Sequence, residues 1–270
     1  MKLIFFSMAS GSSGNCYYLG TLEYGILIDA GISIRTIKKV LKDRSVDMSQ
    51  IMGVLVTHDH ADHIKTVGYL GEKLNIPVFS TEGVHQGIAK SRYVEETLCS
   101  SKRIIEKEKP FKIKDFEITA FPVPHDSTDS VGFHIVFGDQ RFTIATDMGH
   151  ITDTVGKYIG MANHLVLEAN YDEEMLKFGT YPQFLKERVA SPTGHLSNRE
   201  AAEFLATHYI PELKDIWLCH LSRDNNHPEL AYKTVDIRLF EEGIRVGKDV
   251  QLVALKRTTP SDVYEFDAEI

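Results

Sequence analysis

The sequence predicts an α/β protein in which short strands and helices follow one another within a single domain, residues 1–270. Apolar runs of strand length alternate with helical segments along the 270 residues. No low-complexity tract, internal repeat or Pro/Gly/Ser-rich linker divides the chain. Residue types that bind metals recur just after the expected strands. The composition, 43% hydrophobic and 25% charged, is ordinary for a soluble globular protein with a sizeable core.

The first half of the chain is expected to open on a strand. Met1–Phe6 has the apolar look of a secretory leader, but Ser10–Asn15 interrupts it at once and no small-x-small cleavage site follows. The strands expected in this half are Leu3–Phe6, Cys16–Leu19, Gly25–Asp29, Ile51–Thr57 and Ile76–Ser80. The helices expected here are Ile34–Leu41, which is basic, and Ile64–Lys73.

The second half contains a hairpin signal and a helix-start signal. Gly138-Asp139 lies between two strand-like runs and is typical of a tight turn. Ser197 with Glu200 three residues later predicts a capping box before a helix that runs through His208. The strands expected in this half are Phe116–Phe121, Val131–Phe137, Arg141–Thr146, Leu165–Glu168 and Asp215–Cys219.

Charge and cysteine content limit the class of protein. A formal net charge of −8 argues against a surface coated in positive charge, although a local basic groove remains compatible with it. No apolar run approaches the roughly twenty residues that a membrane helix needs. Cys16, Cys99 and Cys219 form no paired motif, so we interpret them as buried small hydrophobic residues. They indicate a reducing cytoplasm.

Metal-binding residue types stand at or just past the ends of five expected strands. Because strand ends are rigid platforms whose loops can aim side chains into one crevice, this order predicts a single site along a sheet edge. The five residues are His58, His125, Asp147, Glu168 and His220.

The strongest motif is Thr57-His58-Asp59-His60-Ala61-Asp62-His63, which directly follows an apolar strand. Imidazole and carboxylate are ligands that suit zinc, manganese and iron. Residues two apart in an extended segment point the same way, so His58 and His60 can hold one ion. Asp62 and His63 can turn toward a second ion. The alternative is a solvated polar loop, which would not require so dense a cluster.

This His-x-His-x-Asp-His motif resembles the defining motif of the metallo-β-lactamase superfamily, whose fold is a four-layer αββα sandwich with two mixed sheets. The resemblance covers essentially the whole chain and includes Leu27–Gly31 before the motif. It implies His58, His60 and His125 on one ion. It implies Asp62, His63 and His220 on a second ion, with Asp147 bridging the two. The cofactors implied are two divalent ions, zinc or manganese.

Several residues also have structural interpretations. Taken singly, His125 could sit in a turn, Asp147 could cap a helix or close a turn, and His220 could be a hydrogen-bonded core histidine. Asp29 is expected to orient the histidine loop through hydrogen bonds. His150 fits no ligand position. The histidines expected on the surface or in packing are His85, His134, His164, His208 and His227.

The expected chemistry is hydrolysis without a protein nucleophile. Two cations about 3.5–4 Å apart can share a water and hold it as hydroxide for in-line attack, with Asp62 orienting it. A phosphodiester also needs protonation of its leaving oxygen. His195, with Glu168 as partner, resembles the histidine–glutamate couple of the ribonuclease Z branch. The alternative for His195 is a neighbour of the helix start with no chemistry.

Within the superfamily the chain is similar to the YycJ/WalJ/VicX-type family. The similarity lies in Ser10–Tyr18, Gly194–Asn198 and the string from His220 to Ala231. It implies a phosphodiesterase acting as a 5′→3′ DNA exonuclease. Ser10–Asn15 could present backbone N–H groups to a phosphate, or could be a plain tight turn.

The substrate depends mainly on this resemblance. Arg199 and Arg223 flank the expected site, but no aromatic residues interleave with basic ones in the way that grips single strands. Five bases near the first helix are explained as well by a solvated face as by DNA contact: Arg35, Lys38, Lys39, Lys42 and Arg44. Two alternatives stay open, an ester or thioester hydrolase of the glyoxalase II kind and a non-catalytic, metal-stabilised regulatory partner. The sequence leaves the oligomeric state open.

Overall fold

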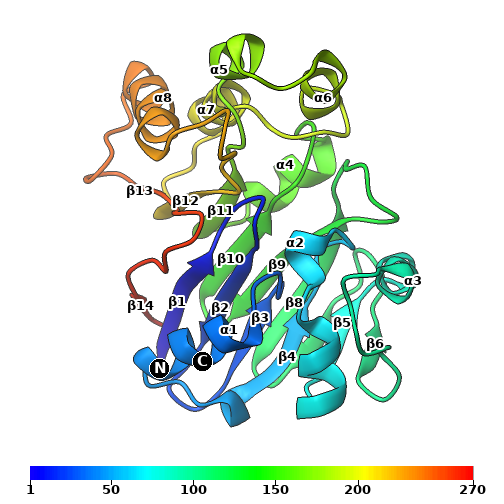
Figure 1. Cartoon of the computed structure of the whole chain (residues 1–270). Coiled ribbons are helices and arrows are strands. Elements are labelled where there is room, and N and C mark those ends of the chain that lie inside the picture. The colour runs from blue at the N-terminus through cyan, green and yellow to red at the C-terminus, as the bar shows by residue number, and fades with distance from the viewer. Residues whose placement is uncertain (270) are drawn as a thin grey trace.

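The computed structural model describes residues 1–269, which form two seven-stranded sheets packed face to face (Figure 1). The first sheet has the order β14-β1-β2-β3-β4-β5-β6. Its strands are β1 (Lys2–Ala9), β2 (Cys16–Gly20), β3 (Gly25–Ile28), β4 (Ile51–Leu55), β5 (Val78–Ser80), β6 (Lys102–Ile104) and β14 (Tyr264–Asp267). The sheet is mixed, because β14, β1, β2 and β3 pair antiparallel whereas β3 to β6 pair parallel.

The second sheet has the order β13-β12-β11-β10-β9-β8-β7 and is also mixed. Its strands are β7 (Phe111–Ile113), β8 (Phe116–Pro122), β9 (Val131–Phe137), β10 (Gln140–Ala145), β11 (His164–Glu168), β12 (Asp215–Cys219) and β13 (Gln251–Ala254). The predicted hairpin is confirmed, since β9 and β10 pair antiparallel across Gly138, which has a left-handed φ of 57°.

Three apolar clusters define the four layers. Phe5 of β1 packs against Trp217 of β12 between the sheets, with ring centroids 4.6 Å apart. The next residue, Phe6, points the other way, into a cluster with Ile37 of the first helix. A third cluster lies between the second sheet and its own helices. The fold class predicted from the sequence, an αββα sandwich with two mixed sheets, is therefore confirmed.

Eight α-helices are described in residues 1–269. They are α1 (Ile34–Asp43), α2 (Ala61–Ile64), α3 (Glu82–Lys90), α4 (Asp153–Ile159), α5 (Glu173–Phe178), α6 (Gln183–Val189), α7 (Asn198–Thr207) and α8 (Pro228–Glu241). A 3₁₀ turn (Met48–Gln50) precedes β4, and a π-helical turn (Tyr69–Lys73) follows α2. The capping box predicted for α7 is confirmed: the Ser197 hydroxyl accepts from Glu200 N, and the Glu200 carboxylate accepts from Ser197 N.

The helix expected at Ile64–Lys73 is wrong as a continuous element. The α-helix starts earlier, at Ala61, and stops at Ile64, before the π-helical turn. A continuous helix would need the Thr66 N–H to donate to the Asp62 carbonyl. Instead Thr66 donates to Ala30 O at 2.9 Å, and Asp62 O accepts from Asn15 N at 2.7 Å. The Thr66 N–H and the Asp62 carbonyl, which a continuous helix would pair with each other, are therefore hydrogen-bonded to neighbouring segments instead.

The cysteine prediction needs one correction. All three cysteines are free, and Cys16 and Cys219 are buried as expected, but Cys99 is exposed. Cys99 lies in an irregular stretch before β6, where no strand or helix carries it into the core. None of the helices in residues 1–269 is both long and apolar enough to cross a membrane.

Candidate metal centre

The histidine motif occupies the loop between β4 and α2. His58 forms an isolated bridge with Ser130, at the end of the strand as predicted. His60 is the residue that precedes α2, and the short helix then carries Asp62 and His63. His58 and His63 are buried, whereas His60 and Asp62 are half-buried and open toward solvent. The loop and the start of α2 therefore present four donor side chains within residues 58–63.

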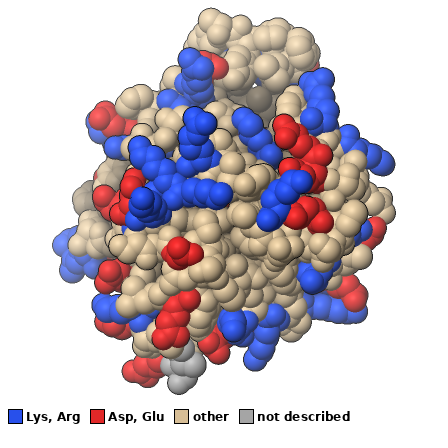
Figure 2. All heavy atoms as spheres, turned by 60° about the horizontal axis from the view of Figure 1, so that its bottom comes forward, with Lys and Arg blue, Asp and Glu red and all other residues tan. Residues whose placement is uncertain are grey.

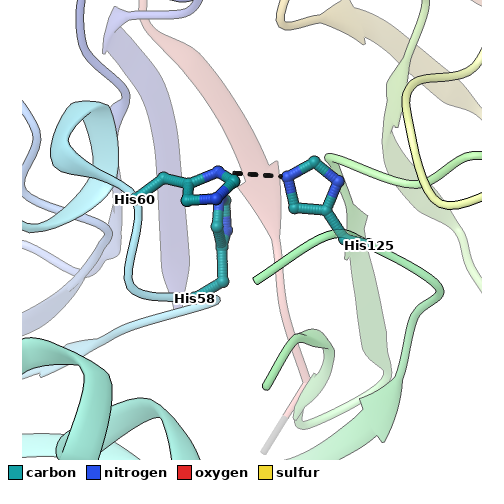
Figure 3. A group of neighbouring side chains, drawn as sticks. All are labelled: His58, His60 and His125. Carbon is teal, nitrogen blue, oxygen red and sulfur yellow. Dashed lines mark hydrogen bonds between the residues drawn. The ribbon is translucent and has the colours of Figure 1, made fainter. Parts of the chain in front are cut away.

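The first donor group is His58, His60 and His125, whose ring nitrogens lie within 4.8 Å of one another. Figure 3 shows His58 and His60 on the motif loop, with His125 facing them from the segment after β8. His60 Nδ1 and His125 Nε2 are 3.2 Å apart. Three imidazoles from two different sheets thus converge on one point.

The second donor group is Asp62, His63 and His220, again within 4.8 Å. Asp62 Oδ2 lies 3.2 Å from His220 Nε2 and 3.7 Å from His63 Nε2. Asp147 stands between the two groups. Its Oδ2 is 3.3 Å from His63 Nε2, and its Oδ1 is 3.8 Å from His125 Nε2. The structure therefore brings together all seven residues that the sequence nominated as ligands.

Three strand-end residues at the site adopt left-handed backbone conformations. Asp29, Asp147 and His220 have φ values of 58°, 54° and 53°. Non-glycine residues adopt this region at an energetic cost, and such strain gathers where surrounding structure over-determines a functional geometry. Asp29 and His220 directly follow β3 and β12, and Asp147 lies two residues past the end of β10, so each turn directs its side chain from the sheet edge into the site.

Asp29 orients the motif loop, as the sequence predicted. Its carboxylate accepts from Thr57 N at 2.9 Å and lies 2.7 Å from His63 Nδ1. With Nδ1 engaged, Nε2 of His63 is the nitrogen that faces the donor group. His125 is fixed in the same way, because its Nδ1 lies 3.0 Å from the Gly194 carbonyl oxygen. Hydrogen bonds outside the donor set thus fix which ring nitrogen points inward.

His195 and Glu168 form a close pair beside the donor groups. His195 Nδ1 lies 2.7 Å from Glu168 Oε1. The other carboxylate oxygen accepts from Met148 N at 2.8 Å and Leu196 N at 3.3 Å, which locks Glu168 in place. Glu168 is fully buried, whereas the His195 side chain is 17% exposed. Nε2 of His195 is therefore the ring nitrogen left for a bound molecule.

The buried charges influence one another strongly. Burial lowers the pKa of His58, and the neighbouring His63 lowers that pKa further, so the His58 ring is neutral. Burial alone would raise the pKa of Asp147, but His220 and His63 outweigh it and hold that pKa well below its ordinary value. Burial likewise opposes charge on His195, but the Glu168 carboxylate outweighs it and raises the His195 pKa. Metal ions bind ionised carboxylates and neutral imidazoles. Burial opposes charge on His63 and His220, but Asp29 and Asp147 outweigh it and raise their pKa values, so both rings would release a proton on binding an ion.

One orphaned atom fits a metal ion in particular. Nε2 of His58 is buried with no hydrogen-bond partner, although a buried polar atom without a partner is costly. Its Nδ1 lies 3.0 Å from Thr57 Oγ1, so Nε2 is the free nitrogen on the face toward His60 and His125. A divalent ion would satisfy this atom, and the His/Asp donors suit such an ion.

Sequence reasoning missed three polar residues that brace the site. Asn15 Nδ2 lies 2.9 Å from His63 Nε2, and Asn170 Nδ2 lies 3.1 Å from His220 Nδ1. The Ser10 hydroxyl accepts from His220 N at 2.9 Å. Ser10 and Asn15 bound the serine-glycine stretch that the sequence analysis left open between phosphate binding and a tight turn. In this stretch Gly11 N, Gly14 N and Asn15 N all donate within the protein, as in the turn interpretation.

The structure shows how three of the basic residues considered as possible DNA contacts are placed. Arg44 does not point outward with the bases of α1: its Nη2 donates to Ser261 O at 2.6 Å, and its guanidinium lies 4.8 Å from the Phe6 ring. Arg199 is exposed but pairs with Glu173 at 3.3 Å. Arg223 is exposed. The five histidines expected outside the site, and His150, belong to none of the donor groups in the described residues.

Comparison with known proteins agrees with the fold. Residues 24–214 match the model of the Beta-lactamase superfamily domain. The metallo-beta-lactamase fold protein YhfI from Bacillus subtilis superposes with a TM-score of 0.70 at 16% identity, covering 98% of this chain and all of that one. The chain belongs to the metallo-β-lactamase superfamily, whose fold suggests divalent-metal binding, and its clustered donors are the candidate site.

Relatives that match almost the whole chain identify its family within the superfamily. The chain is 35% identical over 252 residues to Exodeoxyribonuclease YycJ of Bacillus anthracis, covering 93% of this chain and 95% of that protein. It is 34% identical over 258 residues to Exodeoxyribonuclease WalJ of Streptococcus pneumoniae, covering 96% of each. Within the superfamily, the chain is a member of the YycJ/WalJ-type family.

Proposed function

We propose that this protein is a metal-dependent phosphodiesterase that degrades DNA as a 5′→3′ exonuclease. The observation that carries the proposal is the His195–Glu168 pair, which lies beside a complete His/Asp donor set. A metal site alone serves many hydrolases, but a histidine poised to protonate a leaving oxygen suits phosphodiester cleavage. Two relatives named exodeoxyribonucleases, similar over almost the whole chain, support the same activity.

The proposed site holds two zinc or manganese ions. The first is assigned to His58, His60 and His125, and the second to Asp62, His63 and His220. Asp147 is assigned to both, because its carboxylate lies 3.3 Å from His63 Nε2 of the second group and 3.8 Å from His125 Nε2 of the first. The ions draw ligands from segments after both sheets, which supports residues 1–270 acting as one domain. When bound, they supply an activated water and stabilise charge on phosphoryl oxygens.

The protein's own residues perform the remaining steps. Asp62 is half-buried at the opening, where its carboxylate orients the attacking water. His195 donates a proton from Nε2 to the leaving 3′ oxygen, and Glu168 holds the opposite ring nitrogen and stabilises the charged imidazole. Buried Glu168 cannot turn away, because two backbone N–H groups grip its other oxygen. The pair thus stays aligned with the opening of the site.

A basic helix face supports DNA as the polymer. Four bases of α1 are exposed, and Figure 2 shows Lys and Arg side chains gathered on the side of the molecule that includes α1: Arg35, Lys38, Lys39 and Lys42. The segment leading into α1 packs on the motif loop, since Ala30 N donates to His63 O at 2.8 Å. Phosphate contacts here would position a strand without reading its sequence.

The free cysteines support a cytoplasmic location.

Degradation of end-labelled polymers tests the proposal. Metal-reconstituted protein is incubated with 5′-labelled and 3′-labelled DNA, duplex and single-stranded, and with RNA. We expect stepwise release of mononucleotides from the 5′ end of DNA. Asp62→Ala should abolish the release, and His195→Ala should slow it severely while metal content stays unchanged. Turnover of a thioester but of no polymer by the folded, metallated protein would overturn the proposal in favour of a small-molecule hydrolase.

A further inference from the structure

A cavity of about 300 Å³ opens directly beside the first donor group. His60 forms part of its wall, so a molecule bound there would lie next to the reacting centre. The opposite wall comes from the end of α3 and the residues after it. The lining side chains used below are His60, Asp59, Thr128, Gly87, Lys90 and Tyr93.

The cavity wall is tied to the motif loop. Asp59, between His58 and His60, accepts from Thr128 N at 3.1 Å and from Thr128 Oγ1 at 2.6 Å. A Cβ added at Gly87 of α3 would lie 1.9 Å from Asp59 Oδ2, so only glycine lets α3 pack this closely on the loop. The contacts of Asp59 with Thr128 and with Gly87 therefore hold the loop that carries His60 close to the α3 wall of the cavity.

The segment Lys90-Ser91-Arg92-Tyr93 gives this wall its chemistry. Lys90 is exposed in the last turn of α3, and the Tyr93 side chain is 48% exposed. Arg92 braces the tyrosine: its Nη2 donates to the Tyr93 hydroxyl at 3.0 Å, and its guanidinium lies 5.1 Å from the ring centroid. An exposed aromatic ring beside basic side chains is the combination that binds a base together with its phosphate.

We propose that this cavity binds the nucleotide next to the scissile phosphate, with the base stacked on Tyr93 and its phosphate on Lys90. The inference rests on the proposed nuclease function and names a subsite for it. Asp59 is the acidic residue of the cavity lining. Its carboxylate accepts two hydrogen bonds from Thr128. Stacking serves any base, so the subsite positions the strand without selecting a sequence.

Steady-state kinetics on duplex DNA with metal-loaded protein test the subsite. Tyr93→Ala should raise KM about tenfold, in line with the loss of one stacked base, and leave kcat within about twofold. Tyr93→Phe keeps the ring and should behave as wild type. Lys90→Gln should raise KM and weaken its dependence on salt. Phe240→Ala, which removes an aromatic side chain that is 68% exposed on α8, is the matched control.

A binding measurement separates failure of the subsite from failure of the nuclease. Thymidine 5′-monophosphate is titrated calorimetrically into metal-loaded wild type and Tyr93→Ala. We expect about tenfold weaker binding by the variant, whether or not the protein cleaves DNA. Equal KM values and equal nucleotide affinities for wild type and Tyr93→Ala would overturn the inference. A wild type that binds the nucleotide but degrades no DNA would instead refute the proposed function.

Discussion

His195 is the residue on which the proposed chemistry depends most directly. Replacing it with Gln keeps a polar side chain but removes the group that can protonate the leaving oxygen. We expect His195→Gln to lower kcat for duplex DNA by about 10²–10⁴-fold, the usual contribution of general acid catalysis. Metal content, measured by mass spectrometry, should match wild type. Loss of an ion from the variant would instead make His195 a ligand, which its place near Asp147 and His220 also permits.

His134 offers a pH test away from the site. It is buried on β9, where its Nδ1 lies 2.8 Å from Thr143 Oγ1 and its Nε2 has no partner. Burial, and secondarily Arg141, lowers its pKa from 6.5 to about 4. Because the unfolded chain takes up the proton first, this residue's contribution to stability is present above pH 6.5. It is lost as the pH falls toward 4.

The matching experiment compares unfolding free energies across that window. Relative to wild type, His134→Gln should lose less stability between pH 7 and pH 4, by about 3 kcal/mol at 1.36 kcal/mol per pKa unit. His208→Gln, at an exposed position, is the control and should follow wild type. Parallel pH profiles for wild type and His134→Gln would show that His134 is not held neutral.

At the same scale, the residue types of the site were visible in the sequence but its bracing was not. His, Asp and Glu residues just after strands indicate a metal site, and the resemblance to the family implied which of them bind which ion. Asn15, Asn170 and Ser10 act through hydrogen bonds to His63 and His220, and polar residues of these types are too common in turns to stand out. Tyr93 lies beside Lys90 and Arg92 in a short basic–aromatic string, so the expectation that no aromatic residue interleaves with basic ones is wrong for this segment.

At the scale of elements, close backbone packing holds the motif loop. Gly31, just after β3, donates its N–H to Asn15 O at 2.9 Å, and a Cβ built on it would lie 1.6 Å from Asp62 O. We expect Gly31→Ala to push the motif loop away, destabilise the protein by about 1–3 kcal/mol and reduce metal occupancy. Chemical unfolding and metal analysis measure the two effects.

A second glycine provides the control for that substitution. Gly160, which ends α4, has a φ of −64°, and an added Cβ would meet nothing closer than 3.4 Å. Gly160→Ala should therefore change stability by no more than about 0.5 kcal/mol. Full metal occupancy and wild-type stability in Gly31→Ala would mean that the loop tolerates displacement and that its tight packing does not position Asp62.

Elements were predictable where their pattern is local. The hairpin at Gly138 and the capping box at Ser197 each depend on residues a few positions apart, and both are confirmed. β14 pairs with β1 from the other end of the chain, and β6 is a short, largely exposed edge strand. β6, Lys-Arg-Ile, carries no apolar alternation, and the alternation in β14, Tyr-Glu-Phe-Asp, spans only four residues, so long-range pairing rather than local sequence defines both strands.

At the scale of the whole molecule, the ions should couple the two sheets. His58 and His60 follow β4 of the first sheet, whereas His125 and Asp147 follow β8 and β10 of the second. Without ions, only the neighbouring histidines balance the carboxylates of Asp62, Asp147 and Glu168. Ligand binding at one hundred times Kd stabilises a fold by about 3 kcal/mol. We therefore expect chelation to lower Tm by about 5–10 °C.

Differential scanning calorimetry with and without a chelator measures that shift. Asp147→Asn removes the carboxylate assigned to both ions, so its Tm should respond much less to the chelator than wild type does. An unchanged Tm on chelation of the wild type, with metal loss verified, would show that the ions do not link the sheets.

A stoichiometric metal titration measures most directly whether the proposed nuclease needs two ions. Manganese or zinc is added to metal-free protein while mononucleotide release from 5′-labelled duplex DNA is followed. We expect little release up to one ion per chain and a plateau at two. Full release at one ion per chain, or undiminished release in excess chelator, would contradict it.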